Sequence, residues 1–406
     1  MQSMTVPSAL GVSRRMEPST RYSYRTDDPR PPLRICFVID ELAAAGTESQ
    51  LLALIEALDR RRIRPYLCLL RGDNPLSQTL EPDRCPILRL GVGALRHPHT
   101  LVQAYRFVRW LRRERIDVVQ AYFADSSYFS IPLAKLAGVR HRLRTRNNLG
   151  HWLTPLHRRL GRMLNALTTG TIANCEAAKR ALVEAERPRP ETVLVLENGV
   201  DLERFHDLSP LSPEPPDGGV FRVGIVANLR PVKGLDLFVE AAARLRVQHP
   251  RTTFFVAGQG ELQPQLERQA ATLGLNDQFH LLGGISDVPS FLGDLDVAVL
   301  CSHAEGMSNA LLEYMAAGRA IVSTRVGAAA DLIEDGVHGL LVPPGDAERL
   351  SEAIGRLLSD RGLACRLGAA ARHRAANRFS REAMVQRFTD FYERMLHVNR
   401  IDRHSR

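Results

Sequence analysis

Short apolar runs alternate with helix-like segments along most of this chain of 406 residues. The run at 33–40, LRICFVID, has the length of a buried strand, and a loop of small residues follows it. The next segment, at 46–58, repeats leucine and isoleucine at the spacing of an amphipathic helix. Uninterrupted apolar strands are typical of parallel sheets that helices cover on both faces. The pattern therefore predicts an α/β fold assembled from βαβ units.

One stretch interrupts this alternation. The segment 206–219, HDLSPLSPEPPDGG, contains four prolines and two glycines in fourteen residues, a composition that excludes regular secondary structure. Strand-like runs resume directly after it, so we predict two doubly wound, Rossmann-like domains that share a cleft at the carboxyl ends of their strands. The predicted divisions are a mobile tail at 1–32, an N-terminal domain at 33–205, a linker at 206–219, a C-terminal domain at 220–380 and a terminal helix at 381–406.

Composition limits the classes of protein to which the chain can belong. Hydrophobic residues make up 44% and charged residues 24%, values that exclude disorder, collagen and a disulfide scaffold for most of the chain. No apolar run approaches the roughly 20 residues of a membrane-spanning helix, and the first residues lack a signal-peptide core, so we expect a cytoplasmic protein. The six cysteines form no CxxC pair, which predicts buried free thiols and no metal site.

Positive charge is concentrated in the first half of the chain. Residues 1–217 carry 32 Lys and Arg against 24 Asp and Glu, and the remaining residues are almost balanced. Such an excess can serve a nucleic acid, an anionic lipid or a phosphorylated substrate. Four arginines alternate along a predicted strand and so share one face, namely Arg140, Arg142, Arg144 and Arg146. That face is either a solvated surface or a patch for anionic lipid or a phosphorylated acceptor, whereas nucleic acid is disfavoured because few aromatic residues accompany the arginines.

The segment 302–318, SHAEGMSNALLEYMAAG, is the strongest candidate for a binding site. Glu305 lies in a loop after a predicted strand, and Glu313 lies about one turn inside the helix that follows. Backbone N–H groups between Gly306 and Asn309 lack intrahelical acceptors and can bind a phosphate, while the carboxylates can accept hydrogen bonds from sugar hydroxyls. The alternative is a solvated helix N-terminus with a glutamate in its first turn.

A second candidate lies in the segment 226–242, VANLRPVKGLDLFVEAA. Asn228, Arg230 and Lys233 follow the end of a predicted strand, where cations suit a diphosphate, although an ordinary basic loop has the same pattern. In the first half of the chain, Gly46 lies between a strand and its helix. It either allows a backbone to approach a phosphate or only forms a turn.

Three further patterns argue against other chemistry. We interpret ENGVD at 197–201 as an Asn-Gly turn after a strand. DLD at 294–296 resembles a metal-binding motif, but it directly precedes an apolar strand, so we interpret it as a turn. No GxGxxG motif follows the first strand with an acidic residue about 20 positions later, which disfavours a dinucleotide-dependent dehydrogenase.

In their order and spacing, these segments make the chain resemble the family-4 retaining glycosyltransferases of the GT-B fold, over about residues 33–395. The motifs that carry the resemblance are EGMSNALLE, LRPVKG, ANCEAAKRAL, ENGVDLERF, VAGQGEL and STRVGAAADLIEDGVHGLLVPPGD. The resemblance implies a nucleoside-diphosphate sugar held mainly by the second domain, and a terminal helix that crosses back to the first. It also implies a hexosyltransferase of class EC 2.4 that retains anomeric configuration, without a cofactor or a metal, in cell-surface, exopolysaccharide or glycolipid biosynthesis.

The resemblance implies roles for individual residues. Glu305 would contact the hydroxyls of the donor sugar, Glu313 the nucleotide ribose, and Lys233 the diphosphate. The rest of the implied donor site consists of Gly306, Met307, Ser308 and Asn309 around sugar and phosphate, the backbone of Ile285 against the base, and Gly46, which would close on the diphosphate from the first domain.

The chain departs from the family pattern at two places. Asn228 stands where the family usually has an arginine, and Arg230, two positions later, is our candidate to supply the guanidinium group. Many members also have a histidine in the cleft of the first domain. Here Arg146 stands in that stretch and His151 comes slightly later, and we assign both to the acceptor side of the site.

Two classes of function therefore remain open. The first is a glycosyltransferase, and the alternative is a non-catalytic protein of the same fold that binds a nucleotide sugar or a glycan. The expected partners are a nucleotide-sugar donor and a glycan or lipid-linked acceptor. The basic N-terminal domain suggests in addition a peripheral contact with anionic lipid at the inner face of the cell membrane. No nucleic acid is expected.

Overall fold

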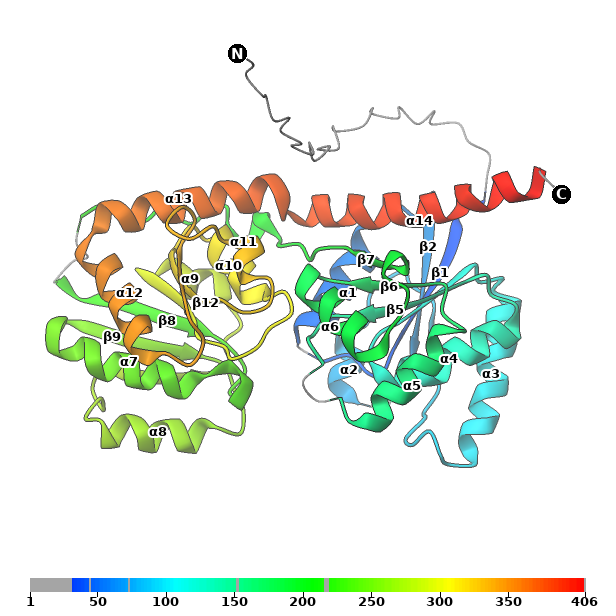
Figure 1. Cartoon of the computed structure of the whole chain (residues 1–406), viewed down its shortest axis with the longest axis horizontal. Helices are drawn as coiled ribbons and strands as arrows, with labels where there is room; N and C mark the ends of the chain where they lie inside the picture. The colour runs from blue at the N-terminus through cyan, green and yellow to red at the C-terminus, as the bar shows by residue number, and fades with distance from the viewer. Residues whose placement is uncertain (1–30, 44, 72–73, 151–152, 215–218, 405–406) are drawn as a thin grey trace, which may run out of the picture.

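Two parallel β-sheets, each covered by helices, form the computed structural model of this chain (Figure 1). The structure describes residues 31–43, 45–71, 74–150, 153–214 and 219–404. Most of the predicted tail, at 1–30, and the predicted site residue His151 therefore lie outside the described residues. The prediction of an α/β fold with two Rossmann-like domains is confirmed.

The first sheet has seven strands in the order β3-β2-β1-β4-β5-β6-β7, and every pair is parallel. Its strands are β1 (Leu33–Ile39), β2 (Ile63–Leu69), β3 (Ile87–Arg89), β4 (Val118–Ala121), β5 (His141–Arg146), β6 (Gly170–Ala173) and β7 (Val193–Val195). Its helices are α1 (Gly46–Ala57), α2 (Pro75–Thr79), α3 (His99–Arg113), α4 (Ala124–Ala137), α5 (Pro155–Asn165) and α6 (Glu176–Glu186).

The second sheet has six parallel strands in the order β10-β9-β8-β11-β12-β13. Its strands are β8 (Phe221–Val226), β9 (Thr252–Ala257), β10 (Phe279–Gly283), β11 (Val297–Leu300), β12 (Ala320–Thr324) and β13 (Leu340–Val342). The helices that follow β8 are α7 (Leu235–Gln248), α8 (Gln263–Thr272), α9 (Val288–Gly293), α10 (Asn309–Ala316), α11 (Ala329–Leu332), α12 (Ala347–Ser359), α13 (Arg361–Arg378) and α14 (Arg381–His404). In the described part of the chain, no helix is both long enough and apolar enough to cross a bilayer.

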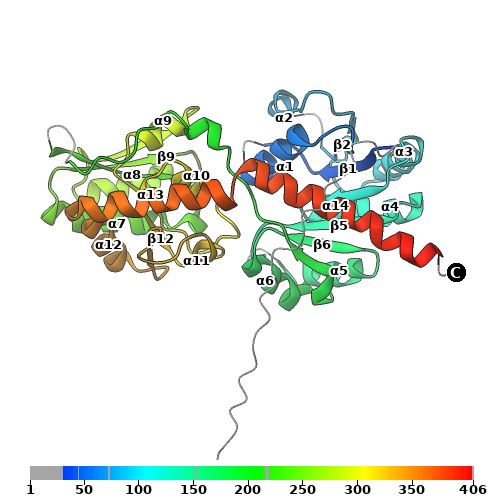
Figure 2. The same cartoon turned by 90° about the horizontal axis from the view of Figure 1, so that it is seen from above.

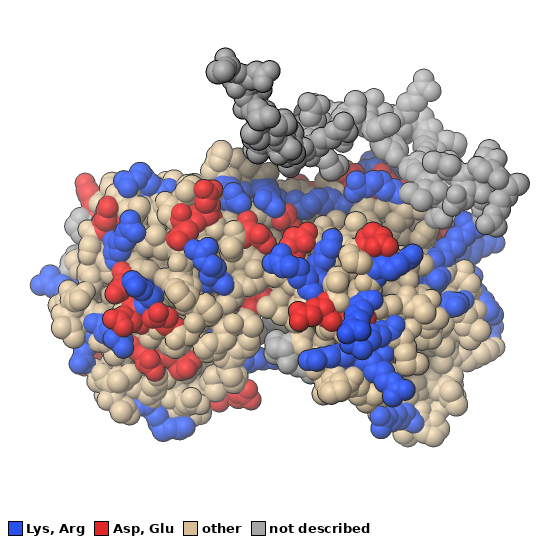
Figure 3. Space-filling view, viewed as in Figure 1, with Lys and Arg blue, Asp and Glu red and all other residues tan. Residues whose placement is uncertain are grey.

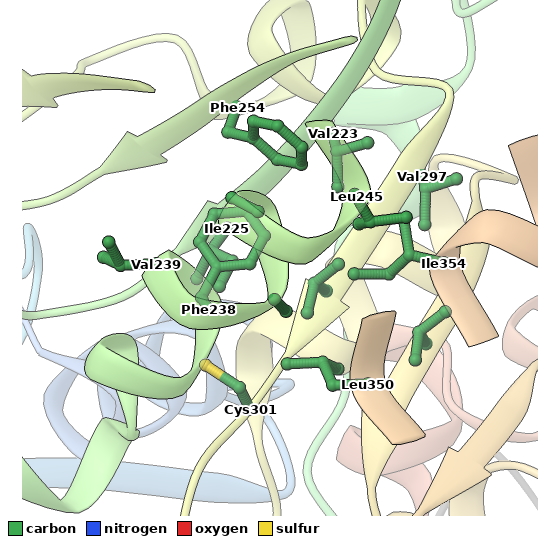
Figure 4. Packing of buried hydrophobic residues seen from close by; sticks show 14 of the residues in the cluster. Val223, Ile225, Phe238, Val239, Leu245, Phe254, Val297, Cys301, Leu350 and Ile354 are labelled. Carbon is green, nitrogen blue, oxygen red and sulfur yellow. The ribbon is translucent and has the colours of Figure 1, made fainter. Parts of the chain in front are cut away.

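Apolar side chains from strands and covering helices make the core of the second domain (Figure 4). Val223 and Ile225 of β8 point toward Phe238 of α7, and Ile354 of α12 closes the same layer. All four side chains are essentially inaccessible to solvent. Because close packing of its central residues holds β8 in place, the loop that leaves its carboxyl end starts from a well-anchored strand.

The last helix links the two domains. Helix α13 lies on the second domain, and α14 continues from it across the first (Figures 1 and 2). Met384, Phe388, Phe391 and Tyr392 of α14 are buried in the same cluster as the strands β1 and β2. The C-terminal helix therefore crosses back to the first domain, as the resemblance implies.

A buried chain of hydrogen bonds accompanies this packing. The hydroxyl of Tyr392 donates to Oε1 of Gln120 in β4 at 2.7 Å. The Nε2 of Gln120 in turn donates to the hydroxyl of Tyr122 at 2.9 Å and to Oγ1 of Thr145 at 3.1 Å. Helix α14 is thus connected, through one glutamine, to residues at the carboxyl ends of two strands of the first sheet.

We expect the substitution Tyr392→Phe to lower the free energy of unfolding by about 1–3 kcal/mol, because it leaves the buried carbonyl oxygen of Gln120 without its donor. Urea titration followed by circular dichroism measures this loss. The matched control is Tyr105→Phe in α3, whose residue is 65% exposed and should give an unchanged midpoint. Equal effects of the two substitutions would contradict the importance of the buried hydrogen bond.

Candidate functional site

Two residues that are far apart in the sequence meet at the carboxyl end of the second sheet. The Nζ of Lys233, which follows β8, lies 2.6 Å from Oε1 of Glu305, which follows β11. The two side chains are 24% and 14% exposed, so water screens the pair only in part. The hydroxyl of Ser302 donates a further hydrogen bond of 2.7 Å to the same oxygen. The two candidate segments thus converge on one charged pair, because β8 and β11 are neighbours in the sheet.

The loop that carries Lys233 is packed tightly against the end of β11. Gly234 has a φ of +60°, and a Cβ there would collide with the carbonyl oxygen of Cys301, so the position requires glycine. The N–H of His303 donates to the carbonyl of Val232 at 2.8 Å, and the thiol of Cys301 donates to the carbonyl of Lys233 at 3.2 Å. Burial raises the pKa of Cys301, so this thiol stays neutral and supports the loop instead of acting as a nucleophile.

The loop that carries Glu305 is held from its other side by the segment after β12. Gly327 has a φ of +54°, and a Cβ there would collide with the carbonyl oxygens of Glu305 and Gly306. The N–H of Ala328 donates to the carbonyl of Gly306 at 2.9 Å. Glycine at two positions therefore lets three loops approach closely enough to fix the charged pair between them.

Helix α10 places the second predicted carboxylate. Ser308 caps its N-terminus, and the hydroxyl of Tyr314 accepts a hydrogen bond of 2.8 Å from the N–H of Val226, which ties α10 to the end of β8. The side chain of Glu313 is 22% exposed, and its Oε1 lies 3.9 Å from Nη1 of Arg204. Burial raises the pKa of Glu313, and the charge of Arg204 opposes this shift.

The start of α10 is also where the two domains touch. The Nδ2 of Asn309 donates to the carbonyl of Gly46 at 3.0 Å, and its Oδ1 accepts from Nδ2 of Asn198 at 2.9 Å and from Nε2 of Gln50 at 3.3 Å. Gln50 also exchanges two hydrogen bonds, of 2.8 and 3.1 Å, with the backbone of Gly199. Asn309 is therefore in direct contact with the Gly46 loop that was predicted to face it.

The next residues of the same loop complete this contact. A Cβ on Gly306 would collide with the carbonyl oxygen of Asn147, which follows β5 of the first sheet. The sulfur of the buried Met307 accepts a hydrogen bond of 3.3 Å from the N–H of Asn198. Every residue from Gly306 to Asn309 is thus engaged in the domain junction or in the cap of α10.

Our prediction of an Asn-Gly turn at 197–201 is wrong. Gly199 does not have a positive φ, and a Cβ there would lie 2.8 Å from the Cβ of Met384. The backbone of Val200 pairs with that of Ser380, so the chain passes directly beneath the junction of α13 and α14. Close passage explains the glycine, and the segment contributes Asn198 to the domain contact, a role that sequence reasoning missed. The only signal was the position of this motif at the carboxyl end of a strand.

Three other predicted donor-site residues lie along the same sheet edge. Asn228 and Arg230 are exposed in the loop after β8. The charge of Arg230 reaches Glu48 of α1, where it opposes burial, which raises the pKa of that carboxyl. Ile285 is partly buried in the loop after β10, the outermost strand on that side. No hydrogen bond or ion pair between described residues joins these three to the Lys233 ammonium.

The alternating arginines of β5 are not a solvated face. Arg144 and Arg146 are 7% and 9% exposed, and both guanidinium groups contact the carboxylate of Glu186, the last residue of α6. Arg142 donates to the carbonyl oxygens of Val139 and Leu167. The interpretations of this face as a solvated surface or as a lipid-binding patch are therefore wrong for Arg144 and Arg146, because alternation shows which residues share a face but not what covers it.

Potential metal ligands are engaged in other contacts. Asp296 accepts a hydrogen bond of 2.8 Å from the N–H of Arg222 and pairs with Arg361 at 2.8 Å, so the DLD motif forms a structural link. The described ranges contain no cluster of three or more His, Cys, Asp or Glu side chains that could hold a metal ion.

Comparisons with known proteins match the two halves of the chain separately. The model for glycosyl transferases group 1 matches residues 213–374, and the model for Glycosyltransferase Family 4 matches residues 44–204. The chain is 35% identical to the lipopolysaccharide core biosynthesis glycosyltransferase LpsE of Rhizobium meliloti over 164 residues. The matched region covers 40% of this chain and 46% of LpsE. It is 33% identical to the lipopolysaccharide core biosynthesis mannosyltransferase LpcC of Rhizobium leguminosarum over 220 residues. This matched region covers 51% of this chain and 61% of LpcC. The chain thus spans about half the length of these relatives.

Solved structures agree in fold. The HepE protein of Anabaena, crystallised in complex with UDP, superimposes with a TM-score of 0.78 at 22% identity, over 89% of this chain and all of that one. At this identity the likeness concerns the fold. Each half of the chain matches one glycosyltransferase family model, and each match covers the part of the chain that forms one of the two sheets. The chain belongs to the family-4 glycosyltransferases of the GT-B fold.

Proposed function

We propose that this glycosyltransferase moves a hexosyl group from a nucleoside-diphosphate sugar to an acceptor hydroxyl, with retention at the anomeric carbon and without a metal. The observation that carries the proposal is the Lys233–Glu305 pair, fixed between the ends of β8 and β11 beside the N-terminus of α10. An ammonium, a carboxylate and free backbone N–H groups in one place match the needs of a ligand that has both phosphates and sugar hydroxyls.

The proposed chemistry depends on stabilising a leaving group. The bond between the anomeric carbon and the diphosphate oxygen breaks, its electron pair stays on the diphosphate, and a new bond forms to the acceptor oxygen on the same face of the sugar. The acceptor proton leaves with the diphosphate. Lys233, Arg230 and the N–H groups at the start of α10 would neutralise the charge that develops, which is the largest single contribution in many enzymes.

Glu305 has two states in this proposal. In the structure its carboxylate is the counterion of Lys233. When a diphosphate takes that place, Oε1 of Glu305 loses the ammonium and becomes available to accept hydrogen bonds from the donor sugar, while the hydroxyl of Ser302 still donates to this oxygen and holds the carboxylate in position. The pair thus keeps the lysine correctly oriented before the donor arrives, and a preorganised cation loses little free energy to reorganisation.

The order of loops along the sheet edge supports an extended donor. Ile285 follows β10, Arg230 follows β8 and Glu305 follows β11, so three strand spacings of about 4.8 Å separate the first loop from the last. We propose that the base lies at Ile285 and the transferred sugar at Glu305, with Glu313 bound to the ribose. Anabaena HepE has been crystallised with UDP and with UDP-glucose, which supports a nucleotide-sugar donor for this fold.

We propose a cell-surface glycan or glycolipid as the product, since LpsE and LpcC act in lipopolysaccharide core biosynthesis. Such an enzyme works beside the inner face of the cell membrane. One surface of α3, which we call the α3 face, suits this place. It consists of Leu101, Tyr105, Arg109 and Arg112, which are spaced to share one side of the helix and are all exposed.

The α3 face combines two features that favour an anionic bilayer. Leu101 and Tyr105 are 77% and 65% exposed, and the exposed Arg109 that follows them can contact lipid phosphates, whereas the guanidinium of Arg112 donates to the carbonyls of Leu136 and Ala137. In Figure 3, Lys and Arg side chains gather on the half of the molecule that the first domain forms. The two apolar side chains would enter the headgroup region while the guanidinium group of Arg109 binds its charge.

We expect Lys233→Ala to reduce turnover about 100- to 1000-fold with the fold intact, because one preorganised partner of the leaving group contributes about 2.7–4 kcal/mol. Release of nucleoside diphosphate from UDP-, GDP- and ADP-sugars, with and without acceptor, measures turnover. The matched control is Lys135→Ala in α4, an exposed lysine of the first domain. Near-normal turnover of Lys233→Ala would rule out the diphosphate role. A wild-type protein that binds a donor but neither hydrolyses nor transfers it would support the non-catalytic alternative.

We expect Glu313→Gln to raise the thermal midpoint at pH 7 and to weaken nucleotide binding about tenfold. Burial raises the pKa of Glu313, so the folded state binds its proton more tightly than the unfolded state, and the ionised side chain destabilises the fold at neutral pH. The difference from wild type should shrink as the pH falls through the ordinary range of a carboxyl, where both states are protonated. Glu240→Gln, at an exposed position of α7, is the control and should leave both quantities unchanged. A lower midpoint in Glu313→Gln at pH 7 would contradict this account.

We expect the double substitution Leu101→Asp and Tyr105→Asp to reduce cosedimentation with phosphatidylglycerol vesicles at least about fivefold, because it removes apolar area and adds repulsion. Wild-type protein should bind these vesicles and not phosphatidylcholine vesicles. Val247→Asp, on a residue of the second domain that is 81% exposed, should bind like wild type. Unchanged sedimentation of the double variant would exclude the α3 face as the contact.

A further inference from the structure

The carboxylate of Glu313 combines burial with unused hydrogen-bonding capacity. Its side chain is only 22% exposed, yet no hydrogen bond from a described residue reaches either carboxylate oxygen. Buried carboxylates normally accept hydrogen bonds, because an unmade bond of a buried charge is costly. Both oxygens of Glu313 are therefore open to donors that the described part of the chain does not supply.

One cation lies beside this carboxylate without occupying it. The Nη1 of Arg204 is 3.9 Å from Oε1 of Glu313, which is beyond hydrogen-bond distance. The pair Arg378–Glu197 shows the contrast, since its guanidinium donates to a carboxylate of similar exposure at 2.7 Å and so uses one of its acceptor sites. Arg204 thus balances the charge of Glu313 and leaves its oxygens free.

The backbone that carries Arg204 is held against the second domain. Arg204 belongs to a short 3₁₀ helix, Leu202–Phe205, and Phe205 is buried in the same cluster as Leu311 of α10. Arg372 of α13 donates from Nη2 to the carbonyl of Phe205 at 3.1 Å. The guanidinium carbon of Arg204 lies 5.8 Å from the centre of the Phe205 ring, within the range of a cation–π contact. Packing therefore gives the side chain a defined origin beside α10.

Arg204 stands between two of the proposed contacts of the nucleotide. Hydrogen bonds from the backbone N–H and the hydroxyl of Ser290 lower the pKa of Asp287, and the charge of Arg204 adds to this effect. Asp287 comes two positions after Ile285, the proposed contact of the base. The guanidinium group thus acts on the loop at the base and on the carboxylate at the ribose.

Other charged groups around α10 are engaged elsewhere, with backbone carbonyls or with one another. They are Arg319, Arg372, Arg374, the pair His206–Asp207 and the pair Lys233–Glu305. Burial raises the pKa of Glu313, and among the described residues Arg204 is the charged group that opposes this shift.

We propose that Arg204 is a positioning residue of the nucleotide site: it supplies the positive charge that the Glu313 carboxylate needs and keeps both carboxylate oxygens free for the hydroxyls of a ribose. The proposal rests on the proposed function, which assigns the ribose to Glu313. When the nucleoside covers this carboxylate, the remaining water leaves, so the charge of Arg204 acts through a lower dielectric constant and counts for more. Without that charge the carboxylate would take up a proton more readily and bind hydroxyls less strongly.

The test is calorimetric titration of the full-length protein with UDP, GDP and ADP, each compared with its 2′,3′-dideoxy form, from pH 5 to pH 9. The measured quantity is the dissociation constant of the dideoxy form divided by that of the ribose form, for the base that binds most tightly. This ratio reports the ribose hydroxyls, because both forms carry the same base and the same titrating diphosphate. In the wild-type protein it should be at least about tenfold at pH 8 and should fall with pH as Glu313 is protonated.

We expect Arg204→Gln to make the ratio fall at a higher pH than in wild type, because burial then raises the pKa of Glu313 without opposition from the guanidinium. At pH 6 the ratio should be at least about threefold below that of wild type, and at pH 9 the two should converge. Arg204→Lys keeps the charge and should restore most of the ratio. Glu313→Gln should give a small ratio that does not change with pH, which identifies the titrating group.

Arg244→Gln, at an exposed position of α7, removes the same kind of charge from the same domain and should leave the ratio unchanged. A ratio in Arg204→Gln that follows wild type at every pH would overturn the proposal. Equal losses of affinity for both forms would do the same, since a merely structural role predicts them, and so would a wild-type protein that binds both forms equally or binds none of the three diphosphates. If Arg204→Gln fails to fold, Arg204→Met, which keeps an apolar stem against Phe205, takes its place.

Failure of the proposed function gives a different result. The wild-type protein would then release no nucleoside diphosphate from any donor sugar, whereas the ratio and its dependence on Arg204 would be unchanged.

Discussion

The close approach of three loops at the carboxyl edge of the second sheet is the constraint on which the candidate site depends. Gly234 lets the Lys233 loop reach β11, and Gly327 lets the segment after β12 reach the Glu305 loop. Without these contacts the ammonium and the carboxylate would be two surface charges, and an exposed ion pair contributes little. Because the backbone is fixed on both sides, the pair is oriented before any ligand binds. The same packing leads the chain into α10, whose first residue contacts the other domain.

The second requirement is that the two domains hold their partial sites at a common place. Helix α14 carries the end of the second domain onto the core of the first, and Tyr392 is connected through Gln120 to Tyr122 at the carboxyl end of β4. Close to the start of this helix, Asn309 bonds to the Gly46 loop and to Asn198. The junction therefore combines apolar packing with a set of polar contacts.

Several elements could be predicted because their signals are local. The strands at 33–39 and 221–226 are short, mostly apolar runs. In a chain of ordinary composition such runs are typical of buried parallel strands. Helix α4 at 124–137 escaped prediction, since it contains three buried serines and an internal proline. The hydroxyls of two of those serines have acceptors of their own, since Ser130 donates to the carbonyl of Ser126 and Ser126 donates to Oδ1 of Asp40. The arginines of β5 were misread for a related reason, because only the fold brings Glu186 over them.

By itself, the sequence determined the fold class, the order of the two sheets and the segments that contain the candidate site, because periodicity and glycine placement act over a few residues at a time. Only the tertiary structure decided which groups meet. Lys233 and Glu305 are 72 positions apart, Arg144 and Glu186 are 42 apart, and Asn309 and Gly46 are 263 apart. A contact between such residues depends on strand order and on the packing of helices against the sheet, neither of which leaves a local pattern in the chain. The shared contact of Arg144 and Arg146 with Glu186 is likewise a property of that packing alone.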